Sequence, residues 1–282
     1  MKVKSVLGLI WMAAVVVTMA WLGKEGYRAA VAYERTAQEM SRLMRAETVA
    51  ESRLRDLAST LTFGMVRNDL RQKLERLRQQ RTWQRRHNQR LAGAFALAAL
   101  AALVSGLFLS PRLYTGLLSL AALIALINGL VTPILMLEVH KEVEYLGDVV
   151  LSFESKGILG SIEKLFSEGN APVALVILLF SVLLPAAKTL ALLFVSLFEY
   201  RPFAAKVVRF FKVLGKWSML DVFVVALLVV YLGGGSGGVS RSEIELGVYF
   251  FIAYVFLSMA ASLAAERMLR SNEQPSNRET EE

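Results

Sequence analysis

Long apolar blocks dominate the chain, and they limit its fold more than any other feature. A helix that crosses the roughly 30 Å hydrocarbon core of a bilayer needs about 20 predominantly apolar residues. Six segments approach this length or reach it: 6–22, 91–109, 117–137, 172–198, 218–232 and 246–264. The chain is 55% hydrophobic and has a mean hydropathy of +0.47. We therefore expect an all-α integral membrane protein with about six transmembrane helices.

Two ionisable residues interrupt these blocks. Lys188 lies in the fourth block, three residues after Pro185, and Asp221 lies near the start of the fifth. A charge inside a membrane span is costly, so such residues usually face the protein interior or a wet cavity. The fourth and fifth blocks are therefore the part of the chain that tells most about function.

Residue usage excludes several kinds of site. The sequence has no cysteine and only two histidines, His87 and His140, which argues against disulfides, thiolate metal sites and histidine-rich metal sites. No Ser/His/Asp set or carboxylate pair occurs at a workable spacing. The glycines of 233–238 lack the following Lys-Ser/Thr of a phosphate-binding loop. We expect no enzyme activity, no metal and no cofactor.

The first apolar block follows two lysines, Lys2 and Lys4. A basic start before an apolar run also occurs in signal peptides, but no clean cleavage site with a plausible mature start follows here. We expect an uncleaved first transmembrane helix, whose two lysines hold its start in the cytoplasm.

Residues 24–90 form a long polar segment of helix-favouring composition without proline. Apolar residues recur in it at spacings of three and four, in two sets separated by a weak breaker around Gly64. This pattern predicts a helical hairpin or bent stalk, and a solvated charged helix with no partner is the alternative. The segment holds half of the 32 Lys and Arg residues, an excess that in a membrane protein more often meets anionic lipid headgroups than nucleic acid. The stalk is also a candidate for self-association.

Charge distribution predicts the topology. The loop after the fourth block carries five basic residues among aromatic ones, which suits a helix lying on an anionic cytoplasmic leaflet. These residues are Arg201, Lys206, Arg209, Lys212 and Lys216. The acidic segment 138–170 then lies outside, both termini lie in the cytoplasm, and the basic segment 24–90 lies outside. The last placement opposes the positive-inside trend, which is weak for loops longer than about 60 residues.

The acidic segment has local structure of its own. Residues 149–153 have strand character, and residues 157–166 read as a short amphipathic helix that ends before Gly169 and Asn170. We expect a small extramembrane loop that contains short strands and one short helix.

The third apolar block carries two polar residues one turn apart, Asn128 and Thr132, close to Pro133. They are candidates for lining a cavity. They are equally candidates for ordinary hydrogen bonds between helices, and the sequence leaves both interpretations open.

Two motifs resemble a known family. Residues 180–188 read FSVLLPAAK, and residues 215–223 read GKWSMLDVF. Together they resemble the paraquat-inducible protein A family of bacterial inner-membrane proteins, whose pattern is Pro-x-x-Lys in one span and Gly-Arg-Trp-Ser-Met-Leu-Asp-Val-Phe at the start of the next. The resemblance covers about residues 117–268, roughly half of the chain.

The resemblance implies a four-helix membrane module with a distant likeness to tetraspanin-type folds. It also implies a role in moving lipid between the inner and outer membranes, beside a periplasmic partner with a mammalian-cell-entry (MCE) domain that forms a tunnel. On this basis we divide the chain into an N-terminal transmembrane hairpin with its stalk (1–113), the family module (114–268) and a disordered polar tail (269–282).

The chain departs from the family pattern in three ways. Lys216 stands where the family has arginine, which keeps the charge but loses the planar fork. The zinc-ribbon cysteines of larger relatives are absent, and the chain has one module instead of two, preceded by an added hairpin of two spans. These departures put the partner and the direction of transport in question.

The polar residues of the two motifs form one candidate site. Pro185 lacks an N–H, so the carbonyl of Ser181 loses its helical donor and the helix should kink there. Ser181 and Lys188, seven residues apart, share a helix face. Asp221 lies one turn inside the next span, where Ser218 can cap the helix. We expect Lys188 and Asp221 to pair across two antiparallel helices.

Such a pair has two interpretations. It can bind a lipid phosphate through Lys188 and take up a proton at Asp221, or it can be a buried ion pair that only fixes helix packing. Three functions follow as hypotheses: a lipid-transport component, a proton- or ion-coupled small-solute transporter, and a non-transporting scaffold for assembly or envelope stress. The absence of an inverted repeat and the few polar positions in the spans argue against the second.

Overall fold

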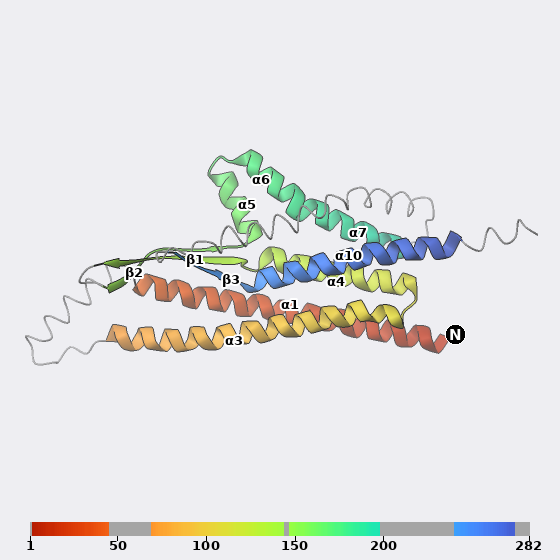
Figure 1. Ribbon diagram of the computed structural model, residues 1–282, viewed down its shortest axis with the longest axis horizontal. Helices are drawn as coiled ribbons and strands as arrows, with labels where there is room; N and C mark the ends of the chain where they lie inside the picture. Colours follow the sequence, from red (N-terminus) through yellow and green to blue (C-terminus); the bar gives the residue numbers. More distant parts are fainter. Residues whose placement is uncertain (1, 45–68, 144–146, 198–239, 274–282) are drawn as a thin grey trace, which may run out of the picture.

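The computed structural model describes residues 2–44, 69–143, 147–197 and 240–273. Within these ranges, five helices are long and apolar enough to cross a membrane. A three-stranded sheet lies at one end of the helix bundle (Figure 1). The expected class, a mostly helical multi-pass membrane protein with short strands outside the spans, is confirmed. The helices are α1 (Lys2–Leu43), α3 (Asp69–Val104), a 3-10 turn (Ser105–Leu107), α4 (Pro111–Val131), α5 (Ile158–Ser167), α6 (Ala171–Ile177), a π-helix (Leu178–Leu183), α7 (Leu184–Leu197) and α10 (Leu246–Glu273).

Two helices combine a membrane span with an arm of the stalk. α1 is 42 residues long and α3 is 36 residues long. They pack side by side as an antiparallel pair along the bottom of Figure 1. Lys73 and Glu39 join their charged halves through a 3.0 Å ion pair. The arms of the stalk are therefore helical and partnered, which argues against the solvated single helix. The predicted breaker around Gly64 lies outside the described residues.

The third span ends earlier than expected. Hydropathy indicated a span over 117–137, but α4 covers Pro111–Val131 and residues 135–137 belong to a strand. The physical reason is Pro133, which disfavours helical backbone in the residue before it. Thr132 accordingly has an extended ψ of 141°. The apolar run Ile134–Leu137 was assigned to the span because a buried strand and a helix end look alike in hydropathy.

The sheet joins two distant parts of the chain. Its strands are β1 (Leu135–Val143), β2 (Gly147–Lys156) and β3 (Ser240–Ile244). They pair antiparallel in the order β2-β1-β3. The predicted strand at 149–153 falls inside β2. Because β3 leads directly into α10, the pairing of β1 with β3 fixes the start of α10 beside the end of α4.

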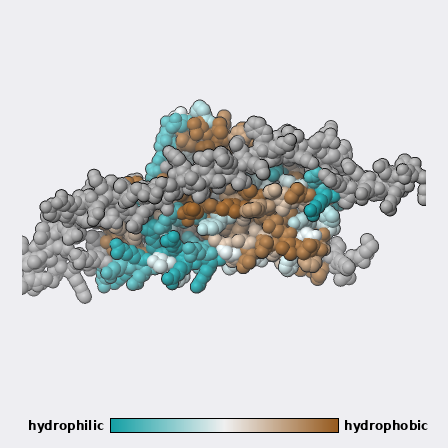
Figure 2. All heavy atoms as spheres, viewed as in Figure 1, coloured by the Kyte–Doolittle hydropathy of each residue, from teal (hydrophilic) through white to brown (hydrophobic). Residues whose placement is uncertain are grey.

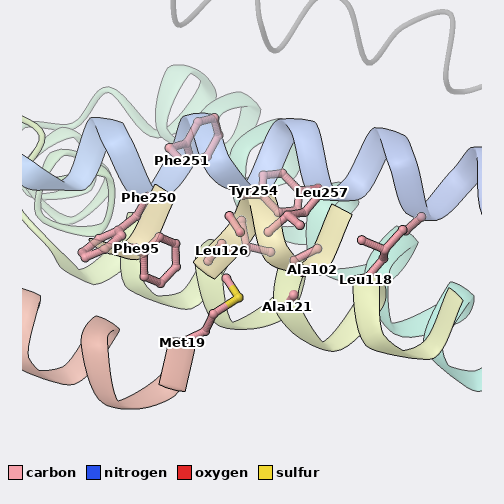
Figure 3. Packing of buried hydrophobic residues seen from close by; sticks show 14 of the residues in the cluster. Met19, Phe95, Ala102, Leu118, Ala121, Leu126, Phe250, Phe251, Tyr254 and Leu257 are labelled. Atoms are coloured by element: carbon pink, nitrogen blue, oxygen red, sulfur yellow. The ribbon is translucent and has the colours of Figure 1, made fainter. Parts of the chain in front are cut away.

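The bundle is built around α4, which packs against α10, α1 and α7. Its buried face consists of small and leucine side chains that are 0% exposed. Lipid tails are as apolar as these side chains, so helices in a bilayer associate through close packing more than through the hydrophobic effect. Figure 3 shows Leu118, Ala121 and Leu126 of α4 facing Tyr254 and Leu257 of α10.

Glycines allow the closest helix contacts. Gly129 of α4 lies against the backbone of Phe251 in α10, where an added Cβ would meet the Phe251 nitrogen at 3.1 Å. Gly247 at the start of α10 is tighter still: an added Cβ would lie 2.5 Å from the carbonyl oxygen of Thr132 and 2.6 Å from that of Pro133. The Gly247 N–H donates to the Pro133 carbonyl at 2.9 Å. This backbone contact leaves no room for a side chain.

A buried ion network attaches the stalk to the sheet. The Arg81 guanidinium of α3 lies 2.9 Å from Glu138 Oε1 of β1 and 3.3 Å from Glu243 Oε2 of β3. The Tyr33 hydroxyl of α1 donates to Glu243 Oε2 at 2.6 Å and accepts from Arg81 Nε at 3.2 Å. The Arg81 and Glu138 side chains are 14% and 8% exposed. Both arms of the stalk therefore bond to the sheet of the family module.

The two ends of the bundle differ in character. The start of α1, the turn between α3 and α4, and the last turns of α7 and α10 lie at one end, whereas the sheet and the stalk lie at the other (Figure 1). Figure 2 shows hydrophilic residues gathered at the stalk end and apolar ones toward the opposite end. The stalk and the strands of the acidic segment therefore share one end of the bundle. Which side of the membrane this end faces stays a prediction.

Three further expectations concern the fifth span, the C-terminal tail and the short helix of the acidic segment. The predicted fifth span (218–232) and the glycine-rich linker (233–238) lie within 198–239, which the structure does not describe. α10 continues to Glu273, so residues 269–273, assigned from composition to the tail, are helical. The predicted short helix at 157–166 is α5 (Ile158–Ser167), and Gly169 follows it with a φ of +81°.

We predict that Gly247→Ala destabilises the protein by about 2 kcal/mol, because an added methyl group forces the α10 backbone away from Pro133. Thermal unfolding in detergent measures the effect. Gly93→Ala in α3 is the matched control, since a Cβ there meets nothing within 4 Å. The control should unfold at or above the wild-type temperature. Equal unfolding temperatures for the two variants would contradict the close contact.

We also predict that Arg81→Ala costs about 3 kcal/mol, because it leaves the buried Glu138 carboxylate and the partly buried Glu243 carboxylate without their cation. For a chain of this size this is roughly a 10 °C fall in Tm. Arg78→Ala, an exposed arginine one turn away on the same helix, should change Tm little. A small effect of Arg81→Ala would mean that the network contributes nothing to the attachment of the stalk.

Candidate functional site

Three residues of the predicted site, Ser181, Pro185 and Lys188, lie on one continuous helix made of three segments, α6, the π-helix and α7. Residues 178–183 form the π-helix, and the Leu184 N–H bonds to the Leu179 carbonyl, five residues back. Pro185 follows immediately and has no N–H to offer Ser181. The irregularity therefore falls where the sequence predicted a kink, in the form of wider π turns. Such segments occur frequently at functional sites of helices.

Ser181 lies within the π-helix and Lys188 lies in α7, and both are half-buried. Pro185 is buried between them, and the buried Thr189 hydroxyl donates to the Pro185 carbonyl at 2.8 Å. The structure thus places Ser181, Pro185 and Lys188 on one stretch of about two helical turns. Their expected partners Ser218 and Asp221 lie outside the described residues, so the Lys188–Asp221 pair stays a prediction. The same holds for the surface residues Arg201, Lys206, Arg209, Lys212 and Lys216.

The far end of this helix is firmly attached to α4. Arg112, near the start of α4, donates from Nε to the Ser196 carbonyl and from Nη2 to the Leu197 carbonyl, both at 2.9 Å. The Ser196 hydroxyl donates back to the Arg112 carbonyl at 2.9 Å. A cation at the last carbonyls of a helix satisfies orphan acceptors and complements the helix dipole. The end of α7 is therefore capped by α4.

The N-terminal half of this helix, α6 and the π-helix, packs much less against the bundle. In α7, Leu192 and Val195 are buried, whereas Ala174 is the buried residue of α6 and the π-helix buries none. Figure 1 shows α6 leaning away from the bundle. Apolar side chains on this half are exposed among the described residues: Val173, Leu175, Val176, Leu179 and Leu183, at 41% to 59%. The helix is thus fixed at the Arg112 end and open at the end that carries Ser181.

Asn128 and Thr132 lie elsewhere, on the side of α4 that faces α1 and α10. The Asn128 amide donates to the Ile124 carbonyl at 2.8 Å, and its side chain packs on Gly23 of α1, where an added Cβ would overlap it. Thr132 is 0% exposed, and its hydroxyl oxygen has no hydrogen-bond partner in the described structure. The structure does not bring either residue together with Lys188. A cavity-lining role for them stays a prediction.

A second polar group lies at the junction of β3 and α10, where two glutamates have opposite pKa shifts. Burial acts to raise the pKa of Glu243, but the hydrogen bond from Tyr33 and the charges of Arg81 and Arg85 outweigh it, so this pKa lies below its usual value. Glu245 is 5% exposed, and burial, helped by the charge of Glu243, raises its pKa to about 8. One carboxyl is therefore held charged and the other neutral near pH 7.

Sequence reasoning did not find this second group. A signal was present in β1, where Met136 and Glu138, two residues apart, lie on the same side of the strand. Both are buried, at 1% and 6% exposed. A glutamate at the inward position of an apolar strand requires a cation, but the sequence alone does not say that Arg81, 57 residues earlier, supplies it. Within the described ranges, no three His, Asp or Glu side chains gather closely enough to hold a metal ion.

Comparison with known proteins identifies a family match and several relatives of this chain. Residues 114–270 match the family model of paraquat-inducible protein A. The intermembrane transport protein PqiA of Escherichia coli K12 is 30% identical over 133 residues, which cover 44% of this chain and 31% of that protein. The PqiA proteins of Escherichia coli O6:H1 and Shigella flexneri match to the same extent. The match thus spans about a third of the length of these relatives.

No solved structure matches the chain. The family match covers more than half of the sequence, and both motifs quoted above, 180–188 and 215–223, lie inside it. The resemblance inferred from those motifs is therefore confirmed, and this multi-pass membrane protein belongs to the paraquat-inducible protein A family.

Proposed function

We propose that the protein is an inner-membrane component of a system that moves phospholipid between the inner and outer membranes of a bacterium. It loads or unloads lipid for a periplasmic tunnel protein of the MCE type. Support for intermembrane transport comes from the relatives, which are named intermembrane transport proteins. Support for lipid as the cargo comes from the chemistry of the α6–π–α7 helix.

The observation that carries the proposal is the combination of features on this helix. Its exposed half is apolar, as acyl chains require, and Lys188 adds one cation beside the π-helix and Pro185. A lysine ammonium pairs with a phosphate as a point charge. In our proposal the phosphate of the lipid binds at Lys188 and Ser181, and the acyl chains lie along Leu179 and Leu183.

In this proposal the α6–π–α7 helix moves because its two ends are attached unequally to the bundle. The Arg112 cap holds the last turn of α7, while the π-helix and Pro185 weaken the regular hydrogen bonding about three to five turns before the end of the helix. The near half of the helix then moves relative to α4 without disturbing the cap. Asp221 takes up and releases a proton as Lys188 changes partners, which couples the movement to the proton gradient.

The proposal makes a prediction about charge. The double variant Lys188→Met/Asp221→Leu should lower phospholipid exchange between the two membranes by about tenfold or more, since a hydrogen bond to a charged group contributes about 1.5–3 kcal/mol. Pulse labelling of phospholipid in cells, followed by separation of the membranes, measures the exchange. Lipid that copurifies with the protein in mild detergent should fall in parallel.

Lys73→Met is the matched control, because Lys73 makes an exposed ion pair on the stalk. It should leave lipid exchange unchanged. If the double variant supports normal exchange at normal abundance, the two charges only fix helix packing and the functional interpretation is wrong. Loss of small-solute uptake with normal lipid exchange would instead favour a solute transporter.

The proposed orientation has a separate test. The chain has no cysteine, so single introduced cysteines report unambiguously. Gln79→Cys on the stalk should react with a membrane-impermeant thiol reagent in intact spheroplasts, whereas Ser110→Cys, exposed at the opposite end of the bundle, should react only after lysis. The reverse pattern would place the stalk and the sheet in the cytoplasm.

A further inference from the structure

One seam of the bundle carries more buried polar atoms than its neighbours can satisfy. This seam lies between α3 and the chain from β3 into α10, and two contacts mark its ends. At the sheet end, Arg81 lies 3.3 Å from Glu243. At the bundle end, the rings of Phe95 and Phe250 meet edge to face with centroids 4.6 Å apart (Figure 3).

Buried polar residues lie between these two contacts in the order of both elements. On α3, positions 81, 84, 88, 91 and 95 follow steps of three and four, so they share one face of the helix. On the other side, Glu245 lies between Glu243 and Phe250 in the chain. Gln84, Asn88 and Glu245 are 9%, 8% and 5% exposed. The order of residues along the two elements places these three buried polar side chains between the two contacts.

Two of these side chains have oxygens without a partner. Gln84 Oε1 and Asn88 Oδ1 make no hydrogen bond in the described structure. An unpartnered buried acceptor is destabilising, so a donor is expected beside it. A glutamate in its charged form only accepts hydrogen bonds, whereas the protonated form has one O–H to donate. The same seam therefore holds acceptors that lack a donor and a carboxyl that becomes a donor on protonation.

We propose that Glu245 is a proton-binding site, and that its protonated carboxyl donates to the amide oxygen of Asn88 or Gln84 and so closes the seam between the stalk and α10. The proton comes from water and returns to water, and no other bond changes. Small residues of α1 let α10 approach closely at this level. Gly26 lies against Phe250, where an added Cβ would be 2.6 Å from the ring, and Ala30 is 1% exposed.

The charges around Glu245 come from every neighbouring element. Arg81 and Arg85 on α3 favour its charged form, while Glu243 on β3 and Glu34 on α1 oppose it. Burial is the largest influence and also opposes the charge, and the pKa of Glu245 rises to about 8. Arg81 lowers the pKa of Glu245, but burial and the two neighbouring carboxylates outweigh it, and Arg81 is also engaged by Glu138 and Glu243.

The sign of the pH dependence follows directly. A carboxyl whose pKa is higher in the folded state stabilises that state at low pH, and the stabilisation is lost as pH rises through the folded value. The seam should thus be closed below neutral pH and should loosen as pH rises through about 8. The Glu243 pair acts in the opposite sense, because its pKa is lowered and its stabilisation is lost as pH falls through the folded value.

Infrared spectroscopy tests the proton directly. Difference spectra of the purified protein, in a detergent without carbonyl groups, should lose the C=O stretch of a protonated carboxylic acid as pH rises, with a midpoint near 8. Glu245→Gln should lack this band. Glu163→Gln, an exposed glutamate of α5, should keep it. A wild-type spectrum with no acid band near neutral pH would overturn the proposal by itself, whether or not the variant folds.

Distance measurements test the consequence. Spin labels at Gln79→Cys on α3 and Ile244→Cys on β3, both exposed positions, should give a narrow distance distribution at pH 6 and a broader one at pH 9. With Glu245→Gln, which stays neutral, the distribution should stay narrow at both pH values. A pH-independent distribution in the wild type, or equal broadening in the variant, would overturn the role of Glu245 in closing the seam.

Discussion

The attachment of the stalk to the sheet depends on one cation that is largely shielded from solvent. Arg81 lies between Glu138 and Glu243, which belong to strands more than 100 residues apart in the chain, and Tyr33 completes the group. A buried arginine needs acceptors for its donors, and buried carboxylates need a cation, so each partner is tolerated only because the others are present. The network thus connects the N-terminal hairpin, which lies outside the matched part of the chain, to the family module. It also fixes β3, and through β3 the position where α10 enters the membrane.

Inside the membrane the helices are held in place by close packing instead of by ion pairs. α4 meets α10 through alanine and glycine steps, and the contact of Gly247 with the carbonyls of Thr132 and Pro133 sets the two helices at backbone distance. Such packing holds the spans together without a hydrophobic driving force between them. The α6–π–α7 helix lacks these contacts over its first half and relies on the Arg112 cap at its end. The rigid and adaptable parts of the module are therefore separate helices.

The sequence was sufficient for the five described spans, for the strand β2 and for the family. It was insufficient for the strands β1 and β3 and for the contacts between distant residues. The apolar blocks and the motifs at 180–188 and 215–223 are local features of the sequence, so they can be recognised without knowing the fold. The end of α4 was misplaced because Ile134–Leu137 is apolar in a strand as it would be in a helix. Arg81, Glu138 and Glu243 were missed because each looks ordinary in its own segment, and only the folded chain brings them together. The irregularity before Pro185 was predictable because a missing N–H is a local property.

The lengths of α1 and α3 have a geometric consequence. At 1.5 Å per residue, the 42 residues of α1 extend over about 63 Å and the 36 residues of α3 over about 54 Å. The hydrocarbon core occupies about 30 Å of this length. The paired arms therefore act as a fixed spacer beside the sheet, stiffened at its base by Arg81. Any large assembly that approaches the bilayer on this side meets the spacer before the membrane surface, so the height at which it can dock is set by helix length.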